Sequence, residues 1–212
     1  VLNLATNTFN ENTTSHYHKS IGGYHPAKLR RYQELVDAYI GEEMGKTASA
    51  VAGAAGDMTK VNGDSIFPVI NMLNTKYFIM GLQTSQAVPI QNPYACGNAW
   101  FVDKVNYVDN ANQELDGLAA IDLRHEAVAD KKFEKQLGTA VKQESTSMAT
   151  LKSYEPNNLK YEVNSEKGGV LVFSEIYYPG WTATVDGQPV ELGRVNYVLR
   201  AMNIKPGKHE VV

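Results

Sequence analysis

The chain has 212 residues, of which 43% are hydrophobic and 20% are charged, and its formal net charge is -3. This composition is ordinary for a folded protein, and the length allows one large domain or two smaller ones. The small negative charge excludes the clustered basic surface that nucleic-acid binding needs. The single cysteine excludes an intramolecular disulfide and a cysteine-rich zinc site.

The beginning of the chain predicts a mixture of helices and strands. Pro26 opens a helix that runs to Ile40 with an apolar face, because the missing N–H group of proline is harmless in the first helical turn. Gly41 ends this helix, and residues 45–63 predict a mobile or loosely helical connection. A short helix capped by Ser65 follows, and residues 75–80 predict a strand.

The next part of the chain continues the alternation. Residues 100–108 predict a strand, and Asp109 or Asn110 predicts the cap of a helix. A strand over residues 126–129 and a short helix over residues 130–137 complete this part. We therefore expect residues 1–138 to form a mixed α/β subdomain.

Beyond Gly138 the pattern changes to strands separated by turns. Asp186-Gly187 predicts a two-residue hairpin turn, because both positions must accept positive φ. The close spacing predicts an antiparallel β-sandwich over residues 139–212, and the fold class is therefore α+β. The expected strands are residues 141–154, 159–164, 169–176, 181–185, 189–192, 196–203 and 208–212.

Several stretches carry a family resemblance. Ser174-Glu-Ile-Tyr-Tyr-Pro-Gly-Trp-Thr-Ala-Thr-Val-Asp-Gly187, Asn196-Tyr-Val-Leu-Arg-Ala201 and Pro206-Gly-Lys-His-Glu-Val211 resemble the distal part of YfhO-family bacterial membrane proteins. Residues 20–35 and 71–79 resemble the same family. The resemblance implies a many-spanning membrane protein that acts as a glycosyltransferase and takes sugars from lipid-phosphate carriers.

The chain itself contains no window of ~20 consecutive apolar residues that would span a membrane. It has no initiator Met and no signal peptide, and it stops within an expected strand. These features agree with what the family resemblance implies, an extracytoplasmic (periplasmic-side) domain of a longer membrane protein. The partners that the resemblance implies are the transmembrane part of the same protein and a polyprenyl-phosphate-linked sugar or a cell-envelope glycan.

The segment from Gly22 to Arg31 is the first candidate binding site. Gly22 and Gly23 allow a ligand to approach the backbone, and a helix start after them presents free N–H groups. An anionic headgroup would suit this place. The alternative is a glycine turn whose basic residues are solvated or paired with nearby acids. The candidate residues are Gly22, Gly23, Tyr24, His25, Lys28, Arg30 and Arg31.

An aromatic cluster is the second candidate site. Tyr177, Tyr178 and Trp181, with Tyr154 and Tyr197, would form a platform that stacks on sugar rings. The alternative is that these rings pack the core of the sandwich. We expect Arg200 to pair across the sheet with an acid such as Asp186 or Glu191.

Other chemistry finds little support in the sequence. His16, His18 and His25 lie close together but lack an accompanying acidic cluster, and a zinc site needs three or four fixed ligands. The chain has no G-x-S-x-G motif, so a nucleophilic serine is not indicated. We expect no metal, no cofactor and no catalytic residue, and a role in donor or acceptor binding without turnover. The alternative is a non-catalytic carbohydrate-binding or surface-interaction module.

Overall fold

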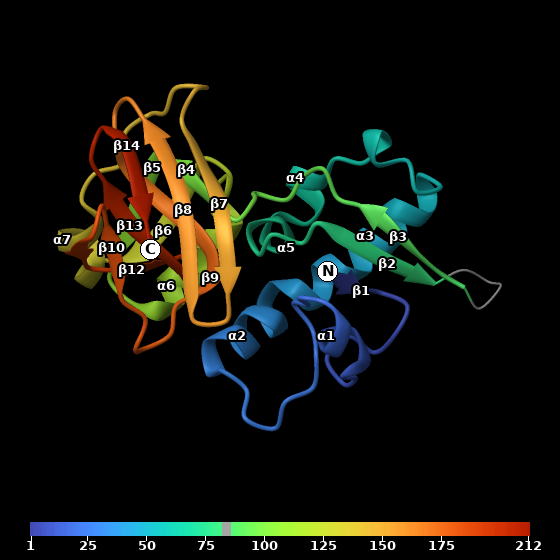
Figure 1. The fold of residues 1–212 in the computed structure, drawn as a ribbon. Coiled ribbons are helices and arrows are strands. Elements are labelled where there is room, and N and C mark those ends of the chain that lie inside the picture. Colours follow the sequence, from blue (N-terminus) through green and yellow to red (C-terminus); the bar gives the residue numbers. More distant parts are fainter. Residues whose placement is uncertain (82–85) are drawn as a thin grey trace. The chain divides into compact units, whose positions relative to one another are not determined.

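The computed structural model describes residues 1–81 and 86–212, and the chain divides into two compact units, Val1–Ala95 and Cys96–Val212. Figure 1 labels helices and strands of both units. The elements of the first unit are, in chain order, β1 (Leu2–Asn3), α1 (Thr13–Tyr17), α2 (Arg30–Leu35), η1 (Val36–Ile40), α3 (Gly41–Gly53), η2 (Met58–Lys60), α4 (Gly63–Ile66), α5 (Pro68–Met72), β2 (Tyr77–Gly81) and β3 (Ala87–Gln91).

The first unit has a small sheet in the order β1-β2-β3. Strand β1 runs parallel to β2, and β2 pairs antiparallel with β3. Phe78 of β2 is fully buried and makes an edge-to-face contact with Phe67, whose ring centroid lies 5.3 Å away. Leu35 and Ile40 are also fully buried, so the helical run contributes its apolar face to a core as its periodicity predicts.

The predicted start of the first long helix is wrong. Helix α2 begins at Arg30, and Leu29 before it is extended, with φ -67° and ψ 119°. The chain after Pro26 instead forms a local turn in which the His25 Nδ1 atom accepts a hydrogen bond from the Ala27 N–H group at 3.1 Å. This local bond competes with the helical pattern, in the way that side-chain acceptors do near helix starts.

The predicted end of this helix is also wrong. Gly41 has helical dihedral angles, φ -59° and ψ -45°, and the chain continues through the π-helical turn η1 into α3. Residues 41–53 contain several alanines, which are the best helix formers, and α3 buries Glu43, Thr47 and Val51 on one face. Residues 45–53 of the expected loose connection therefore form an ordered helix.

The second unit contains the remaining elements. They are, in chain order, β4 (Ala99–Val102), β5 (Lys104–Val108), α6 (Ala111–Asp116), η3 (Gly117–Ala120), β6 (Glu126–Asp130), η4 (Lys131–Phe133), α7 (Glu134–Leu137), β7 (Met148–Glu155), β8 (Asn158–Ser165), β9 (Gly169–Ile176), β10 (Ala183–Val185), β11 (Gln188–Val190), β12 (Gly193–Val195), β13 (Leu199–Ile204) and β14 (Gly207–Val211).

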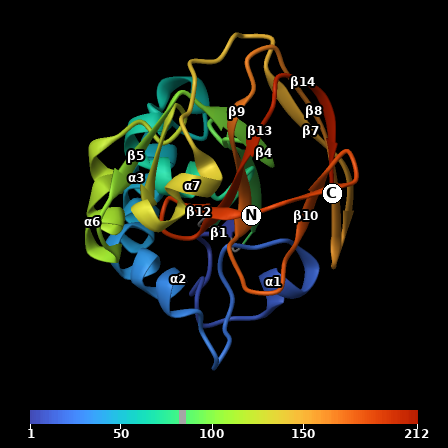
Figure 2. The same cartoon turned by 90° about the vertical axis from the view of Figure 1, so that its left-hand side faces the viewer.

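Two antiparallel sheets form the sandwich of this unit. One has the order β11-β10-β14-β8-β7 and the other β12-β13-β9-β4. Figure 2 shows β7, β8 and β14 in one layer and β4, β9 and β13 in the next. Their facing sides share a hydrophobic core that includes Tyr161, Phe173 and Met202. The α+β class with a C-terminal antiparallel sandwich is confirmed.

A small layer made from α6, α7 and the parallel pair β5-β6 packs on the four-stranded sheet. Glu114 of α6 is fully buried and pairs with Arg194 of β12 at 2.9 Å. Asn196 donates from its backbone to Val128 O at 2.7 Å and accepts from Val128 N at 2.9 Å. These bonds hold Asn196 and Tyr197 at positive φ, so part of the family-like motif has a structural role.

The division between the units differs from the predicted boundary near Gly138. Strand β4 lies before that position, yet it pairs antiparallel with β9, with Ala99 opposite Phe173. Residues on both sides of Gly138 therefore share one sheet, and the compact unit starts at Cys96. In residues 1–81 and 86–212, no helix has both the length and the apolar character that crossing a membrane requires.

Candidate functional site

The second unit contains a cavity of about 530 Å³ that opens between the two sheets of the sandwich. This volume lies within the ~300–1,000 Å³ typical of small-molecule sites. Strands β8, β9, β10, β13 and β14 and the segment before β10 supply the walls. The lining residues are Asn157, Asn158, Leu159, Tyr161, Phe173, Glu175, Pro179, Gly180, Trp181, Thr182, Ala183, Thr184, Leu192, Arg200, Met202, Val211 and Val212.

The inner wall of the cavity is apolar and belongs to the sandwich core. Tyr161 on β8 and Phe173 on β9 face each other edge to face, with ring centroids 5.0 Å apart. Met202 on β13 and Val211 on β14 are buried beside them. Strand alternation explains this arrangement, because alternate side chains of each strand point into the space between the sheets.

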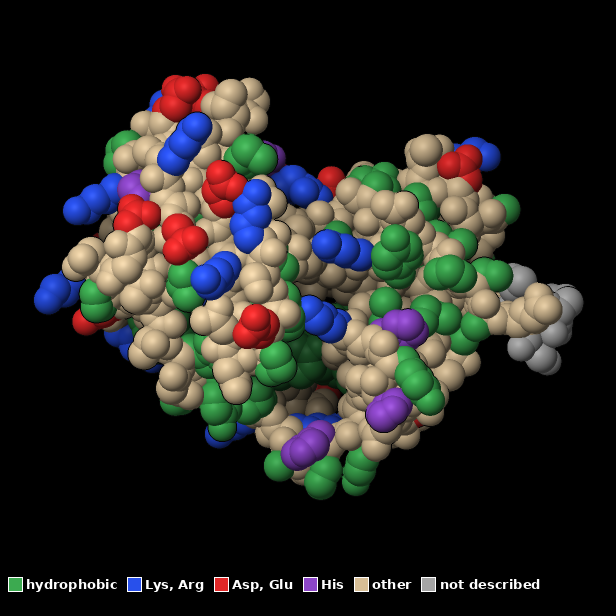
Figure 3. All heavy atoms as spheres, viewed as in Figure 1, with side chains coloured by type: hydrophobic (Ala, Val, Ile, Leu, Met, Phe, Trp, Pro, Cys, Tyr) green, Lys and Arg blue, Asp and Glu red, His purple; other side chains and the backbone are tan. Residues whose placement is uncertain are grey.

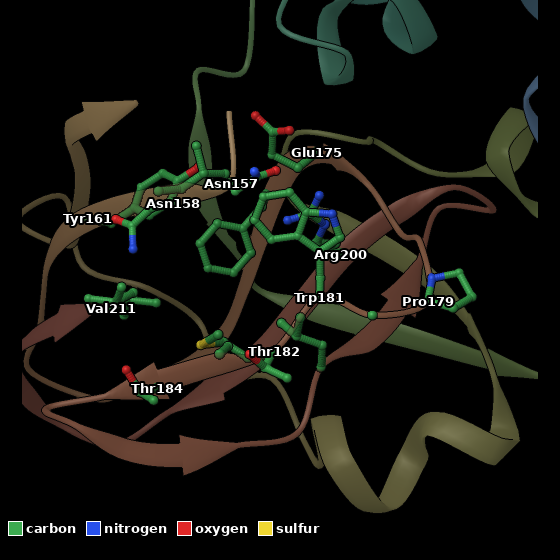
Figure 4. Close-up of a pocket in the computed structure, with 17 residues that line it drawn as sticks. Asn157, Asn158, Tyr161, Glu175, Pro179, Trp181, Thr182, Thr184, Arg200 and Val211 are labelled. Carbon is green, nitrogen blue, oxygen red and sulfur yellow. The ribbon is translucent and has the colours of Figure 1, made fainter. Parts of the chain in front are cut away.

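Trp181 and Arg200 form the centre of the site. The guanidinium carbon of Arg200 lies 3.9 Å from the centroid of the Trp181 ring, which is a close cation–π contact. The Arg200 Nε atom donates to the carbonyl oxygen of Ile176 at 3.0 Å, and the residue is only 8% exposed. Figure 4 shows Arg200 against the Trp181 ring, with Glu175 nearby. The indole thus has one face covered by a buried cation.

The electrostatics of the site centre on Arg200 and Glu175. Burial lowers the pKa of Arg200, and the negative charge of Glu175 opposes this effect. Burial raises the pKa of Tyr161 well above its usual value, and Glu175 adds to the rise. Tyr161 is 3% exposed, and its hydroxyl group has no hydrogen-bond partner among the described residues. The cavity therefore combines an apolar wall with one cation, one acid and a buried hydroxyl.

The outer part of the cavity carries neutral polar groups. Asn157 and Asn158 come from the hairpin between β7 and β8, and Thr182 and Thr184 from the segment around β10. In Figure 4, Asn157 and Asn158 lie on the side of the cavity near the Trp181 ring, whereas Thr184 lies farther from it. Amide and hydroxyl groups both donate and accept hydrogen bonds, so they match a ligand that bears hydroxyl groups.

The predicted aromatic platform is only partly brought together. Trp181 lines the cavity, whereas Tyr177 and Tyr178 are not among its lining residues. Tyr177 packs edge to face on Phe133, with centroids 5.7 Å apart, and Tyr178 is 52% exposed. The glycan role of these residues stays a prediction, and Trp181 has the best placement for it.

The predicted acidic partners of Arg200 are wrong. Asp186 pairs instead with His209, whose Nδ1 atom lies 2.7 Å from Asp186 Oδ2. The side chain of Arg200 faces Trp181 and Glu175, both of which line the same cavity. The reason is that Arg200 points into the space between the sheets, whereas Asp186 occupies the turn of an outer hairpin.

The glycine pair near the start of the chain has a packing role. A Cβ atom at Gly22 would lie 2.5 Å from the Thr8 carbonyl oxygen, so only glycine fits there. Gly23 has φ 126° and donates to Thr8 O at 2.8 Å. Tyr24 N donates to Glu11 O at 3.0 Å and to Asn12 Oδ1 at 3.0 Å. These contacts hold two loop segments together.

The basic residues of this segment do not share one helix start. Lys28 lies before α2, whereas Arg30 and Arg31 are its first residues. Arg30 is 91% exposed at its side chain and pairs with Glu34 at 2.9 Å, as the paired alternative expects. Binding of an anionic headgroup by Gly22 to Arg31 stays a prediction.

The histidines of the first unit lie in exposed positions. His16 belongs to α1 and contacts Tyr17 edge to face, His18 follows that helix, and His25 lies in the turn described above. Within the described residues, no group of three or more His, Cys, Asp and Glu side chains is placed to hold a metal ion.

A second cavity, of about 710 Å³, lies beside β4 and the start of β7. It contains the pair His125 and Asp103, whose atoms Nδ1 and Oδ2 lie 3.1 Å apart. Asp103 also accepts a hydrogen bond from Gln143 N at 2.8 Å. The two side chains already bond to each other, so this cavity is the weaker candidate for a ligand.

The sequence interpretation missed Tyr161 as a site residue. The alternation of Leu159, Tyr161 and Val163 with charged residues on β8 indicates that the tyrosine points inward. A buried tyrosine usually finds a partner for its hydroxyl group. Strand pattern therefore predicts the burial of Tyr161, but its position beside Trp181 and Arg200 requires the strand order.

Comparison with known proteins gives one family. A family model described as "Bacterial membrane protein YfhO" matches residues 121–212, which include every residue that lines the first cavity. The expected resemblance is thereby confirmed for this part of the chain. No curated protein and no solved structure matches the chain.

Proposed function

Because residues 121–212 match a family of bacterial membrane proteins, we propose that this chain is the extracytoplasmic domain of a polytopic membrane protein that transfers sugars from a lipid carrier. In this proposal the transmembrane part of the same protein holds the catalytic residues. The domain binds part of the sugar donor or of the glycan acceptor and performs no turnover itself.

The cavity around Trp181 is the observation that carries the proposal. Aromatic rings supply a flat apolar surface for a sugar ring, and a few polar groups around them fix its orientation. Trp181, Phe173 and Tyr161 supply the rings, whereas the amides and hydroxyls of the outer part supply hydrogen bonds. A site of this kind serves donor positioning and acceptor positioning equally well.

A non-catalytic carbohydrate-binding module is the second candidate function. The same cavity favours it, because glycan binding does not require a catalytic partner. The two functions differ in what the parent protein does. Only the first requires that changes in the cavity alter sugar transfer by the membrane part.

The test uses the parent membrane protein in native membranes that are supplied with a radiolabelled sugar on polyprenyl phosphate. Trp181→Ala removes the central ring, and Tyr17→Ala is the matched control, because Tyr17 is 73% exposed and lies outside the cavity. We expect Trp181→Ala to reduce transfer at least tenfold and Tyr17→Ala to leave it unchanged. Equal transfer by both variants would contradict the proposal. Transfer that is lost only in Trp181→Ala would favour the sugar-transfer function over the carbohydrate-binding module.

A further inference from the structure

The cavity holds a buried hydrogen-bond donor that the described residues do not satisfy. The hydroxyl group of Tyr161 has no partner among these residues. Arg200, which lines the same cavity, carries five N–H donors, of which the Nε–H group donates to Ile176 O at 3.0 Å. A buried polar group without a partner destabilises a protein, so such groups are uncommon unless something else satisfies them.

The hydroxyl group of Tyr161 and the guanidinium group of Arg200 lie in the same cavity. Tyr161 and Arg200 both line the cavity, and each influences the ionisation of the other, which places the hydroxyl and the guanidinium close together. Both residues are more than nine-tenths buried, at 3% and 8% exposed. They therefore form an inner, polar spot on an otherwise apolar wall.

The charged residues that line the cavity have a net charge of zero. Arg200 contributes one positive charge and Glu175 one negative charge, and both residues line the same space. An anionic ligand would gain attraction from Arg200 but would meet repulsion from Glu175 in a region of low dielectric. A neutral ligand with hydroxyl groups avoids this repulsion, because its oxygens accept from Arg200 and its hydroxyl protons are donated to Glu175.

The aromatic surface limits the size of the ligand. Arg200 stacks on Trp181 at 3.9 Å, so at most one face of the indole is left for a ligand. A cavity of about 530 Å³ has the volume of a small-molecule site and is large enough for a sugar ring.

We propose that this cavity binds a single neutral, hydroxyl-rich sugar ring, and that Tyr161 and Arg200 select it by donating hydrogen bonds to its oxygens while Glu175 accepts one. The inference rests on the proposed function, because it specifies the ligand of the same site. Tyr161 is then a specificity residue whose hydroxyl has no role in the folded protein alone.

The experiment measures binding to this chain by isothermal titration calorimetry with three kinds of probe. The neutral probes are the methyl glycosides of glucose, galactose and N-acetylglucosamine. The carboxylate probe is the methyl glycoside of glucuronic acid, and the phosphate probe is glucose 6-phosphate. We expect saturable binding of at least one neutral glycoside, and at least fivefold weaker binding of both anionic probes. Tighter binding of either anionic probe would overturn the neutral assignment.

Tyr161→Phe is the sharpest variant, because it removes one oxygen that makes no hydrogen bond in the described protein. We expect an affinity about tenfold lower, as one lost hydrogen bond predicts, with an unchanged melting temperature. Trp181→Ala should abolish binding. Loss of binding in Trp181→Ala with full affinity in Tyr161→Phe would overturn this inference and leave the proposed function standing. Absence of binding by every probe would overturn the inference and the assignment of the glycan site together.

Discussion

Buried polar residues of this chain have two different roles. Glu114 and Glu43 are buried but fully engaged, the first with Arg194 and the second with two backbone N–H groups at the start of α5. Tyr161 is buried with a hydroxyl group that has no partner among the described residues, and it lines the cavity together with Arg200. The first pattern leaves the buried carboxylates satisfied within the fold, whereas the second indicates a ligand.

Glu43 provides a prediction about pH. Its carboxylate accepts from Val69 N at 3.0 Å and from Ile70 N at 2.9 Å. Burial nevertheless raises the pKa of Glu43 to about 7, from an ordinary value of 4.5. Because the folded-state pKa is the higher one, the stability linked to this proton is fully present below pH 4.5. It is lost as the pH rises towards 7, and the loss is about 3 kcal/mol.

Denaturant unfolding of the wild type and of Glu43→Gln from pH 4 to pH 8 measures this effect. Glutamine keeps the size of the side chain and does not titrate. We expect the wild type to lose stability relative to Glu43→Gln between pH 4.5 and pH 7. Parallel stability curves would show that the carboxylate titrates at its ordinary value.

At the scale of elements, turns and helix caps could be predicted from neighbouring residues, whereas a helix start and a strand that depend on other contacts could not. The Asp186-Gly187 turn forms as predicted, with φ 51° and 76°, and Asn110 caps α6 by accepting from Gln113 N at 3.0 Å. The start of α2 was not predictable from Pro26, because a side-chain bond of His25 competes with the helix. Strand β3 was missed because Pro89 within it argues against a strand, and its stability comes from pairing with β2.

The two glycines Gly22 and Gly45 give opposite predictions. Gly22→Ala would place a Cβ atom 2.5 Å from the carbonyl oxygen of Thr8, and we expect it to destabilise the protein by about 1–3 kcal/mol. Gly45 lies inside α3 with no neighbouring atom within 4 Å of an added Cβ. Gly45→Ala should therefore stabilise the protein by about 0.5–1 kcal/mol.

Denaturant unfolding of these two variants also tests the extent of α3. If Gly45→Ala lowers the stability, residues 41–53 are not a regular helix. If Gly22→Ala is neutral, the close approach of Thr8 is not required for packing.

An ionic pair joins the β10–β11 hairpin to β14. His209 Nδ1 lies 2.7 Å from Asp186 Oδ2, and Nε2 lies 3.0 Å from Lys205 O, so both ring nitrogens face acceptors. The hydrogen bond to Asp186 raises the pKa of His209, and the same bond lowers the pKa of Asp186. The stabilisation linked to the raised pKa of His209 is fully present below pH 6.5 and is lost as the pH rises through that raised pKa. The stabilisation linked to the lowered pKa of Asp186 is present above pH 3.8 and is lost as the pH falls through that lowered pKa.

Asp186→Asn is the matched variant, because asparagine also tolerates the positive φ of this turn. We expect the stability difference from the wild type to be largest between about pH 4 and pH 6.5 and to decrease above that range. Thermal unfolding at pH 5, 7 and 9 measures it. A difference that grows with pH would contradict a protonated His209 in the folded protein.

At the scale of the molecule, the strand order determines which residues line the cavity, and the sequence pattern does not predict this order. The cavity collects residues from β8, β9, β10, β13 and β14, which are neighbours only after the two sheets have formed. The aromatic motif pointed to Trp181 but not to Tyr161 or Arg200. The face in Figure 3 carries Lys and Arg side chains interspersed with Asp and Glu, which is consistent with the small net charge of -3.

The most direct test of the account is an amide NMR titration of the isotope-labelled chain with the neutral methyl glycosides. The account predicts saturable shifts at Tyr161, Trp181 and Arg200 and at the indole N–H group of Trp181, with the segment from Gly22 to Arg31 unchanged. Saturable shifts confined to Gly22 through Arg31 would place the ligand in the other unit and contradict the assignment of the site. Spectra without any saturable shift at millimolar glycoside would contradict glycan binding by this domain.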